Sequence, residues 1–159
     1  MTSKALSLWV KIISVALAVC AVGLCIVALP TNGGDLMDVF AVPTAYQMIY
    51  TVIFWLCVLP WFLIFGMMWR EANDIKNENV FTNASAVRIK QAAYILMADI
   101  AFFACANIAL FIFLQEPVTL FIASIFLDIF GLSVGVLGLV LARYLTIAAD
   151  LQEESAATI

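Results

Sequence analysis

Two aspartates, Asp99 and Asp128, each lie near the middle of an apolar run that contains no other charged residue. An ionised carboxylate is costly in hydrocarbon, so such a residue must be protonated, paired or hydrated. Two roles fit this chemistry. Neutral or hydrogen-bonded aspartates would lock neighbouring helices together, whereas ionisable ones would bind a proton, a cation or a basic group on a partner. Because the chain keeps two of them on neighbouring runs, we favour the functional role.

Helical rise predicts which polar groups share a level with these carboxyls. At 1.5 Å per residue from the basic residues that mark the inner boundary, Asp99 lies about 14 Å deep and Asp128 about 22 Å deep. This offset of about 8 Å argues against a shared proton, unless the helices are strongly tilted. Asn107 and Trp55 fall within about one turn of Asp128, and Trp61 falls at about the depth of Asp99. Amide and indole N–H groups donate hydrogen bonds, so the predicted binding residues are Asp99, Asp128, Asn107 and Trp55.

The catalytic and metal-binding chemistry open to the chain is narrow, because none of its 159 residues is histidine. Ser-His and Cys-His nucleophile pairs, zincin motifs, imidazole metal sites and histidine-ligated haem are therefore excluded. The sequence also contains no glycine-rich phosphate loop and no familiar motif of an intramembrane aspartyl protease. We therefore expect no enzymatic activity, no catalytic residue, no metal and no cofactor.

The four cysteines, Cys20, Cys25, Cys57 and Cys105, all lie within apolar runs. No oxidant-facing loop is available to pair them, so disulfides are not predicted. Cys20 and Cys25 are five residues apart, which turns them onto different faces of a helix and argues against a metal pair. We expect the cysteines to act as small packing residues.

The elements that must position these residues are membrane-spanning helices. Hydrophobic residues make up 66% of the chain and charged residues only 11%, which is too few for a water-soluble surface. Four apolar runs, at about 8–29, 44–69, 92–114 and 118–141, are each near or above the ~20 residues that a spanning helix needs. The longest polar segment, 70–91, is too short to bury a core. The sequence therefore predicts an all-α integral membrane protein, with residues 1–159 forming a single four-helix transmembrane domain.

The distribution of basic residues predicts the orientation of this domain. All seven basic residues fall on one side of the predicted spans, whereas the two opposite loops carry only Asp35, Asp38 and Glu116. Because loops rich in lysine and arginine stay in the cytoplasm, we expect both termini to be cytoplasmic. The basic residues are Lys4, Lys11, Arg70, Lys76, Arg88, Lys90 and Arg143.

Local patterns extend this picture beyond the apolar runs. A short amphipathic stretch is expected at 36–42, and the second helix is expected to continue into the cytoplasmic loop. Thr82 or Asn83 can cap the third helix, and the fourth is expected to continue past Arg143 into an acidic end at 150–154.

Gly131, Gly135 and Gly138 lie in the fourth predicted span. The first two have the GxxxG spacing that lets another helix approach closely. We favour packing against a helix of the same chain over homodimerisation.

Residues 79–82 (Asn-Val-Phe-Thr), 86–90 (Ala-Val-Arg-Ile-Lys) and the terminal 151–159 resemble the bacterial membrane family catalogued as domain of unknown function 2975. In that family a Phe-Ser/Thr turn precedes the third span and the chain commonly closes on an acidic stretch ending in Thr-Ile. Here Ser-Ala-Ala at 155–157 replaces the usual Asn-Asp-Leu. The resemblance implies a four-span fold and a bacterial origin, and it implies no activity.

Our leading hypothesis is a non-enzymatic accessory or regulatory subunit in the bacterial cytoplasmic (inner) membrane. It would bind a membrane-protein partner or a second copy of itself, and no nucleic acid. The alternative is a small proton- or cation-coupled transporter that uses the intramembrane aspartates. A transporter should contain an internal repeat or a continuous polar path, and the sequence contains neither.

Overall fold

The computed structural model describes residues 3–27, 45–77, 82–114 and 116–157. These residues form α1 (Ser3–Val27), α3 (Gln47–Lys76), α4 (Asn83–Leu114) and α5 (Val118–Ala157), with no strand among them. All four helices are long and apolar enough to cross a membrane, which confirms the predicted four-span all-α fold. In lipid a helix is the open-chain structure that satisfies its own backbone hydrogen bonds, so these apolar sequences become helices. The expected amphipathic stretch at 36–42 lies outside the described residues.

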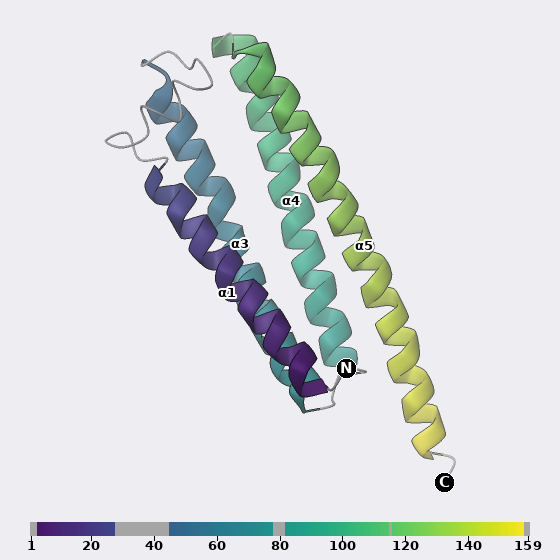
Figure 1. Ribbon diagram of the computed structural model, residues 1–159. Helices are drawn as coiled ribbons and strands as arrows, with labels where there is room; N and C mark the ends of the chain where they lie inside the picture. The colour runs from purple at the N-terminus through teal and green to yellow at the C-terminus, as the bar shows by residue number, and fades with distance from the viewer. Residues whose placement is uncertain (1–2, 28–44, 78–81, 115, 158–159) are drawn as a thin grey trace.

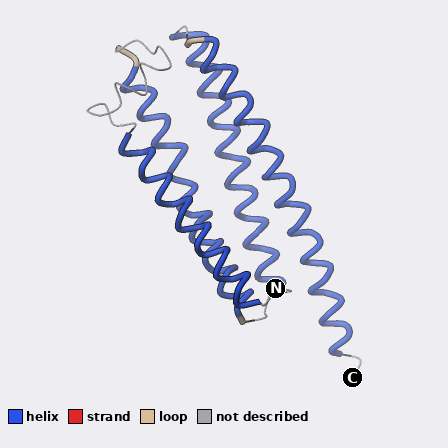
Figure 2. The backbone as a smooth tube through the Cα atoms, in the orientation of Figure 1, coloured by secondary structure: helices blue, strands red, loops and turns tan. Residues whose placement is uncertain are grey.

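The helices form a row of antiparallel neighbours (Figure 1): α1 packs on α3, α3 on α4, and α4 on α5. The α4–α5 pair makes the most extensive contact, while α1 and α5 occupy the two edges of the row. The trace in Figure 2 shows that consecutive helices run in opposite directions. Each edge helix therefore has a long face that is exposed to the surroundings of the protein.

One end of this row carries all the basic residues, and we call it the basic end. It contains the start of α1, the end of α3, the start of α4 and the second half of α5 (Figure 1). The opposite end contains the start of α3 and the connection between α4 and α5. The structure thus brings together the charges that the orientation prediction used.

The helices continue past the apolar runs at the basic end, as the sequence patterns indicated. Helix α3 continues to Lys76, and α4 begins at Asn83, ahead of its apolar run. The Thr82 hydroxyl accepts a hydrogen bond from the Ser85 amide at 3.2 Å, which confirms Thr82 as the cap of α4. Helix α5 continues to Ala157, so residues 142–157 add about 24 Å beyond its apolar run.

The start of the second helix differs from the predicted boundary at 44. Helix α3 begins at Gln47, and Ala45 and Tyr46 form a turn. The Tyr46 carbonyl accepts the amides of Ile49 and Tyr50 at 2.9 and 3.2 Å, which closes the first helical turn. Hydrophobicity indicates which residues can enter lipid, but it does not indicate the residue at which helical backbone hydrogen bonding begins.

Small side chains allow close helix contact at the basic end. Ala72, Ala86, Ala93, Ala142 and Ala149 are all buried. The Ser7 hydroxyl of α1 donates to the Ala72 carbonyl of α3 at 2.5 Å, which ties the first two helices together.

Candidate functional site

The glycines of α5 lie against α4 of the same chain. A Cβ atom added to Gly131 would lie 2.8 Å from Ile100 Cδ1, and one added to Gly135 would lie 2.8 Å from Met97 Cγ. At Gly138 the added atom would lie 3.1 Å from the Cβ of Ala93. These distances are shorter than ordinary contacts. The Ile100 and Met97 side chains could shift, but the Cβ of Ala93 moves only with its backbone, so the missing side chains favour the close approach of α4 and α5.

These contacts also set the register of the two antiparallel helices. With Gly131 opposite residue 100, Asp128 of α5 lies at the level of residue 103 of α4. Asp99 is then about 6 Å away along the axis in one direction, and Asn107 about 6 Å away in the other. The two aspartates are therefore offset by about one turn.

Asp99 is held by the neighbouring helix α3. The Trp61 indole N–H donates to Asp99 Oδ2 at 3.0 Å, in a bond between α3 and α4. The depth estimate had placed these two residues at one level, and the structure joins them. A carboxyl that accepts this bond fixes the register of α3 against α4 at mid-helix.

Asp128 and Asn107 are different, because each keeps a polar atom without a partner. Asp128 Oδ1 and Asn107 Nδ2 are buried and make no hydrogen bond in the described structure. Asn107 is 6% exposed. An unsatisfied buried polar group costs about 1–3 kcal/mol. One atom is an acceptor and the other is a donor, and their residues lie on facing helices about one turn apart.

Cys57 of α3 lies near enough to interact electrostatically with both Asp99 and Asp128. Sequence depth alone did not identify Cys57 as a neighbour, because depth carries no information on which way a helix is turned.

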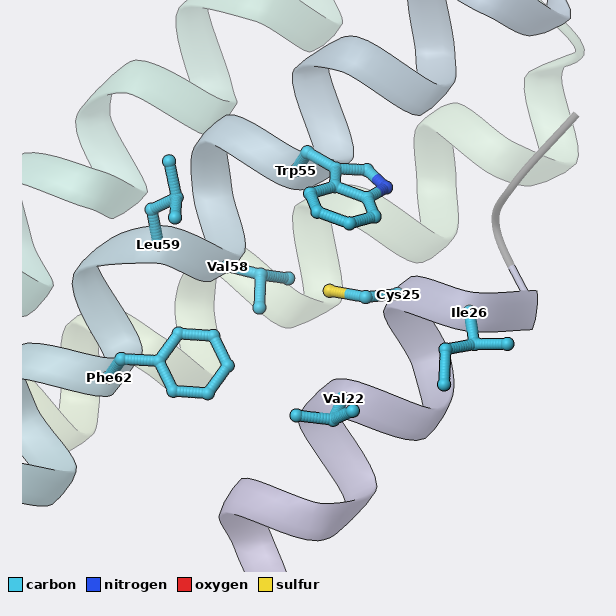
Figure 3. Close-up of a pocket in the computed structure, with 7 residues that line it drawn as sticks. All are labelled: Val22, Cys25, Ile26, Trp55, Val58, Leu59 and Phe62. Atoms are coloured by element: carbon cyan, nitrogen blue, oxygen red, sulfur yellow. The ribbon is translucent and has the colours of Figure 1, made fainter.

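Trp55 belongs to another part of the protein, between α1 and α3. It lines an apolar cavity of about 150 Å³ with Cys25 and Val22 of α1 and with Val58, Leu59 and Phe62 of α3. Figure 3 shows the Trp55 ring beside the Cys25 sulfur. The predicted binding residues are thus distributed over three helix pairs: Asp99 at α3–α4, Asp128 and Asn107 at α4–α5, and Trp55 at α1–α3.

Glu116 is a candidate that the sequence reasoning treated only as a loop charge. It lies between α4 and α5, the residue is 3% exposed, and neither carboxylate oxygen has a hydrogen-bond partner among the described residues. This burial raises the pKa of Glu116 to about 7. Tyr50 of α3 interacts electrostatically with it. The only sequence feature that could have indicated this burial is the position of an acidic residue in a short connection, where the two flanking helices leave little room for solvent.

An ion-pair cluster at the basic end was also missed. Arg88 of α4 donates to Glu71 at 2.5 Å, to Asp74 and to the Ser85 hydroxyl at 3.1 Å. Glu71 and Asp74 are three residues apart, so they share one face of α3. The spacing of Glu71 and Asp74 was the feature of the sequence that could have predicted the cluster. The cluster closes the α3–α4 hairpin where it leaves the apolar region.

Neither a disulfide nor a metal-binding cluster is present among the described residues. All four cysteines are free. Within the described ranges, no three Cys, Asp or Glu side chains lie close enough to hold a metal ion.

The family comparison covers most of these residues. A family model described as "Protein of unknown function (DUF2975)" matches residues 37–159. No curated protein and no solved structure matches the chain. The matched range includes α3, α4 and α5, and so every candidate residue described above except those of α1.

Proposed function

The chain belongs to the DUF2975 family, whose function is unknown, and we propose that it is a non-enzymatic accessory or regulatory subunit that binds a protein partner in a larger membrane assembly. The membrane is the bacterial cytoplasmic membrane in this proposal, with the basic end in the cytoplasm. The main support comes from the part of α5 that continues beyond its apolar run.

Three apolar side chains there form an exposed row, which we call the α5 stripe: Tyr144, Ile147 and Leu151. Their spacing of three and four residues places them on one helix face. Tyr144 is 66% exposed and Leu151 is 61% exposed. Leu151 lies about 12 Å beyond Arg143, past the level where lipid could cover it.

The opposite face of the same segment is already used. Ala142, Leu145 and Ala149 are buried, and α4 is the helix on which α5 packs. An exposed apolar row that runs from the headgroup level of Arg143 to Leu151, on a helix anchored by its other face, is typical of a helix that enters a partner's groove.

Charge around the α5 stripe defines the partner further. Asp150, Glu153 and Glu154 belong to the same segment, and Asn83 Nδ2 approaches Glu153 Oε1 at 3.5 Å. An acidic border favours a partner whose groove is rimmed by lysine or arginine. Within the membrane, Asp128 on the same helix is a second proposed contact, and because its unpartnered oxygen is buried, a donor on the partner would reach it only where α5 shifts against α4.

The test is co-purification in mild detergent from the native membrane, with quantification of each recovered protein. The double variant Tyr144→Ala and Leu151→Ala should reduce partner recovery at least tenfold, because two exposed anchors are lost. The matched control is Leu137→Ala and Leu141→Ala, two exposed residues of α5 inside its apolar run, and recovery should be unchanged. Purification of the unaltered chain as a monomer without any other protein would refute the proposal, as would equal recovery in both variants.

A small proton- or cation-coupled transporter is the second candidate, favoured by the unsatisfied Asp128 and Asn107 atoms, which with Asp99 place three polar side chains at successive levels of the helices. In reconstituted vesicles a transporter should acidify the lumen under an ion gradient, and Asp128→Asn should abolish this because the amide cannot ionise. If instead Asp128 serves a partner, Asp128→Asn should lower co-purification and leave vesicle pH unaffected.

A further inference from the structure

A groove with basic residues at its mouth lies between α4 and α5 at the basic end. It has a volume of about 370 Å³, and its lining includes Lys90 and Tyr94 of α4 with Leu139, Ala142, Arg143 and Thr146 of α5. None of these residues belongs to the predicted binding set or to the ion-pair cluster of Arg88.

The two cations of this groove lack acidic partners. The nearby Arg88 is paired with Glu71 and Asp74. Lys90 and Arg143 pair with no carboxylate in those ranges, and the Lys90 ammonium lies 6.0 Å from the centre of the Tyr94 ring. Two positive charges from neighbouring helices therefore line one groove with no carboxylate of the described residues paired to either.

The position of the groove matches the lipid headgroup level. Lys90 lies two residues before the apolar run of α4, and Arg143 lies two residues after that of α5. The antiparallel register that the glycine contacts set brings both to the same height. Leu139 and the buried Ala142 continue the groove towards the apolar region.

We propose that this groove binds an anionic phospholipid, with Lys90 and Arg143 contacting its phosphate and with an acyl chain lying along Leu139. Basic pockets between transmembrane helices recognise lipid headgroups in this way. A zwitterionic headgroup fits less well, because it would add a third positive charge beside two unpaired ones. The lipid site does not depend on the partner proposed for α5, although Ile147 lines the groove as well as belonging to the α5 stripe.

The test uses the full chain in detergent and measures lipid binding by native mass spectrometry together with thermal stability. Phosphatidylglycerol, phosphatidylcholine and inorganic phosphate are added separately. We expect phosphatidylglycerol to bind and to raise Tm, and the other two to have little effect. The double variant Lys90→Gln and Arg143→Gln should weaken phosphatidylglycerol binding about 30-fold, since each basic residue near an anionic lipid contributes about fivefold.

The matched control is Arg70→Gln and Lys76→Gln, which removes two exposed charges of α3 at the same end but outside the groove. This control should bind phosphatidylglycerol like the unaltered chain. A charge-preserving exchange, Lys90→Arg with Arg143→Lys, should retain binding and shows that loss in the glutamine variant is not misfolding.

Equal weakening in the groove and control variants would overturn the proposal in favour of a diffuse basic surface. Equal binding of phosphatidylcholine would show that the groove does not select an anionic lipid. A rise in Tm with inorganic phosphate alone would show that the groove binds a free anion and not a lipid. Undiminished phosphatidylglycerol binding in the glutamine variant would place the lipid elsewhere.

Discussion

At the scale of single residues, three carboxyl groups differ in their hydrogen bonding, although in the sequence each is simply an acidic residue with no charged neighbour nearby. Asp99 accepts a hydrogen bond from Trp61, Asp128 has a buried oxygen without a partner, and Glu116 has two. A satisfied carboxyl contributes to helix register, while an unsatisfied one is a cost that folding alone does not explain. Asp128 and Glu116 are therefore the better candidates for function.

The buried Glu116 makes stability depend on pH. Its pKa of about 7 in the folded chain exceeds the ordinary value of 4.5, so the folded state holds a proton that the unfolded chain has released between these values. The free energy of unfolding should thus fall as pH rises from 4.5 to 7, by up to about 1.4 kcal/mol per pH unit. Thermal melting in detergent across this range measures the slope.

Glu116→Gln should flatten this slope, because the amide stays neutral at every pH. The exposed Asp150→Asn should leave the slope as it is. The same pH dependence in the unaltered chain and in Glu116→Gln would show that Glu116 does not hold the proton.

At the scale of elements, the α4–α5 pair depends on close backbone approach, whereas α3 and α4 are joined by polar contacts. Glycines on α5 face Ile100, Met97 and Ala93 of α4. Between α3 and α4, Trp61 bonds to Asp99 at mid-helix, and Arg88 pairs with two acids at the basic end. Without a hydrophobic driving force between helices in lipid, such packing and hydrogen bonds are what hold neighbouring helices together.

Replacement of Gly131 and Gly135 by leucine should separate α4 from α5. The unfolding free energy should fall by about 1–3 kcal/mol, the usual cost of overpacking, as measured by thermal or detergent-induced unfolding. Gly23→Leu with Gly66→Leu is the matched control, because an added Cβ meets nothing within 4 Å at either position. If the glycines instead formed a homodimer, the leucine variant would lose the dimer on size-exclusion chromatography while its monomer kept the original Tm.

At the scale of the whole molecule, all seven basic residues lie at one end of the helix row, and the orientation in the membrane follows if that end is cytoplasmic. The two proposed binding surfaces, the α5 stripe and the lipid groove, lie at this end. The basic end would then be where the protein meets both its partner and the inner lipid leaflet.

Cysteine labelling in intact cells tests this orientation. Ala45→Cys at the opposite end should react with a membrane-impermeant thiol reagent, and Asn77→Cys at the basic end should not, because both positions are exposed and only their side of the membrane differs. The unaltered chain, whose cysteines all lie in helices within the apolar runs, is the background control. Reversed labelling would invert the orientation and place the acidic end of α5 outside the cell.

The sequence alone determined the helical architecture of this protein. Four apolar runs predicted four spans, because lipid leaves a polypeptide chain few other ways to satisfy its backbone. Thr82 as a cap, the continuation of α5 into its acidic end and the level shared by Asp99 and Trp61 were also predictable, since caps, helix continuation and depth depend on position along a single chain. Helix starts were less accurate, as α3 shows by beginning at Gln47.

Only the tertiary structure decided which side chains meet. Trp55 shares a level with Asp128 but faces α1, and Glu116 is buried although it lies in a connection. The groove of Lys90 and Arg143 likewise exists only because two helices pack in one register. Depth follows from counting residues, whereas the rotation of each helix about its axis follows from packing against its neighbours, and hydrophobicity spread evenly around a membrane helix does not encode that rotation.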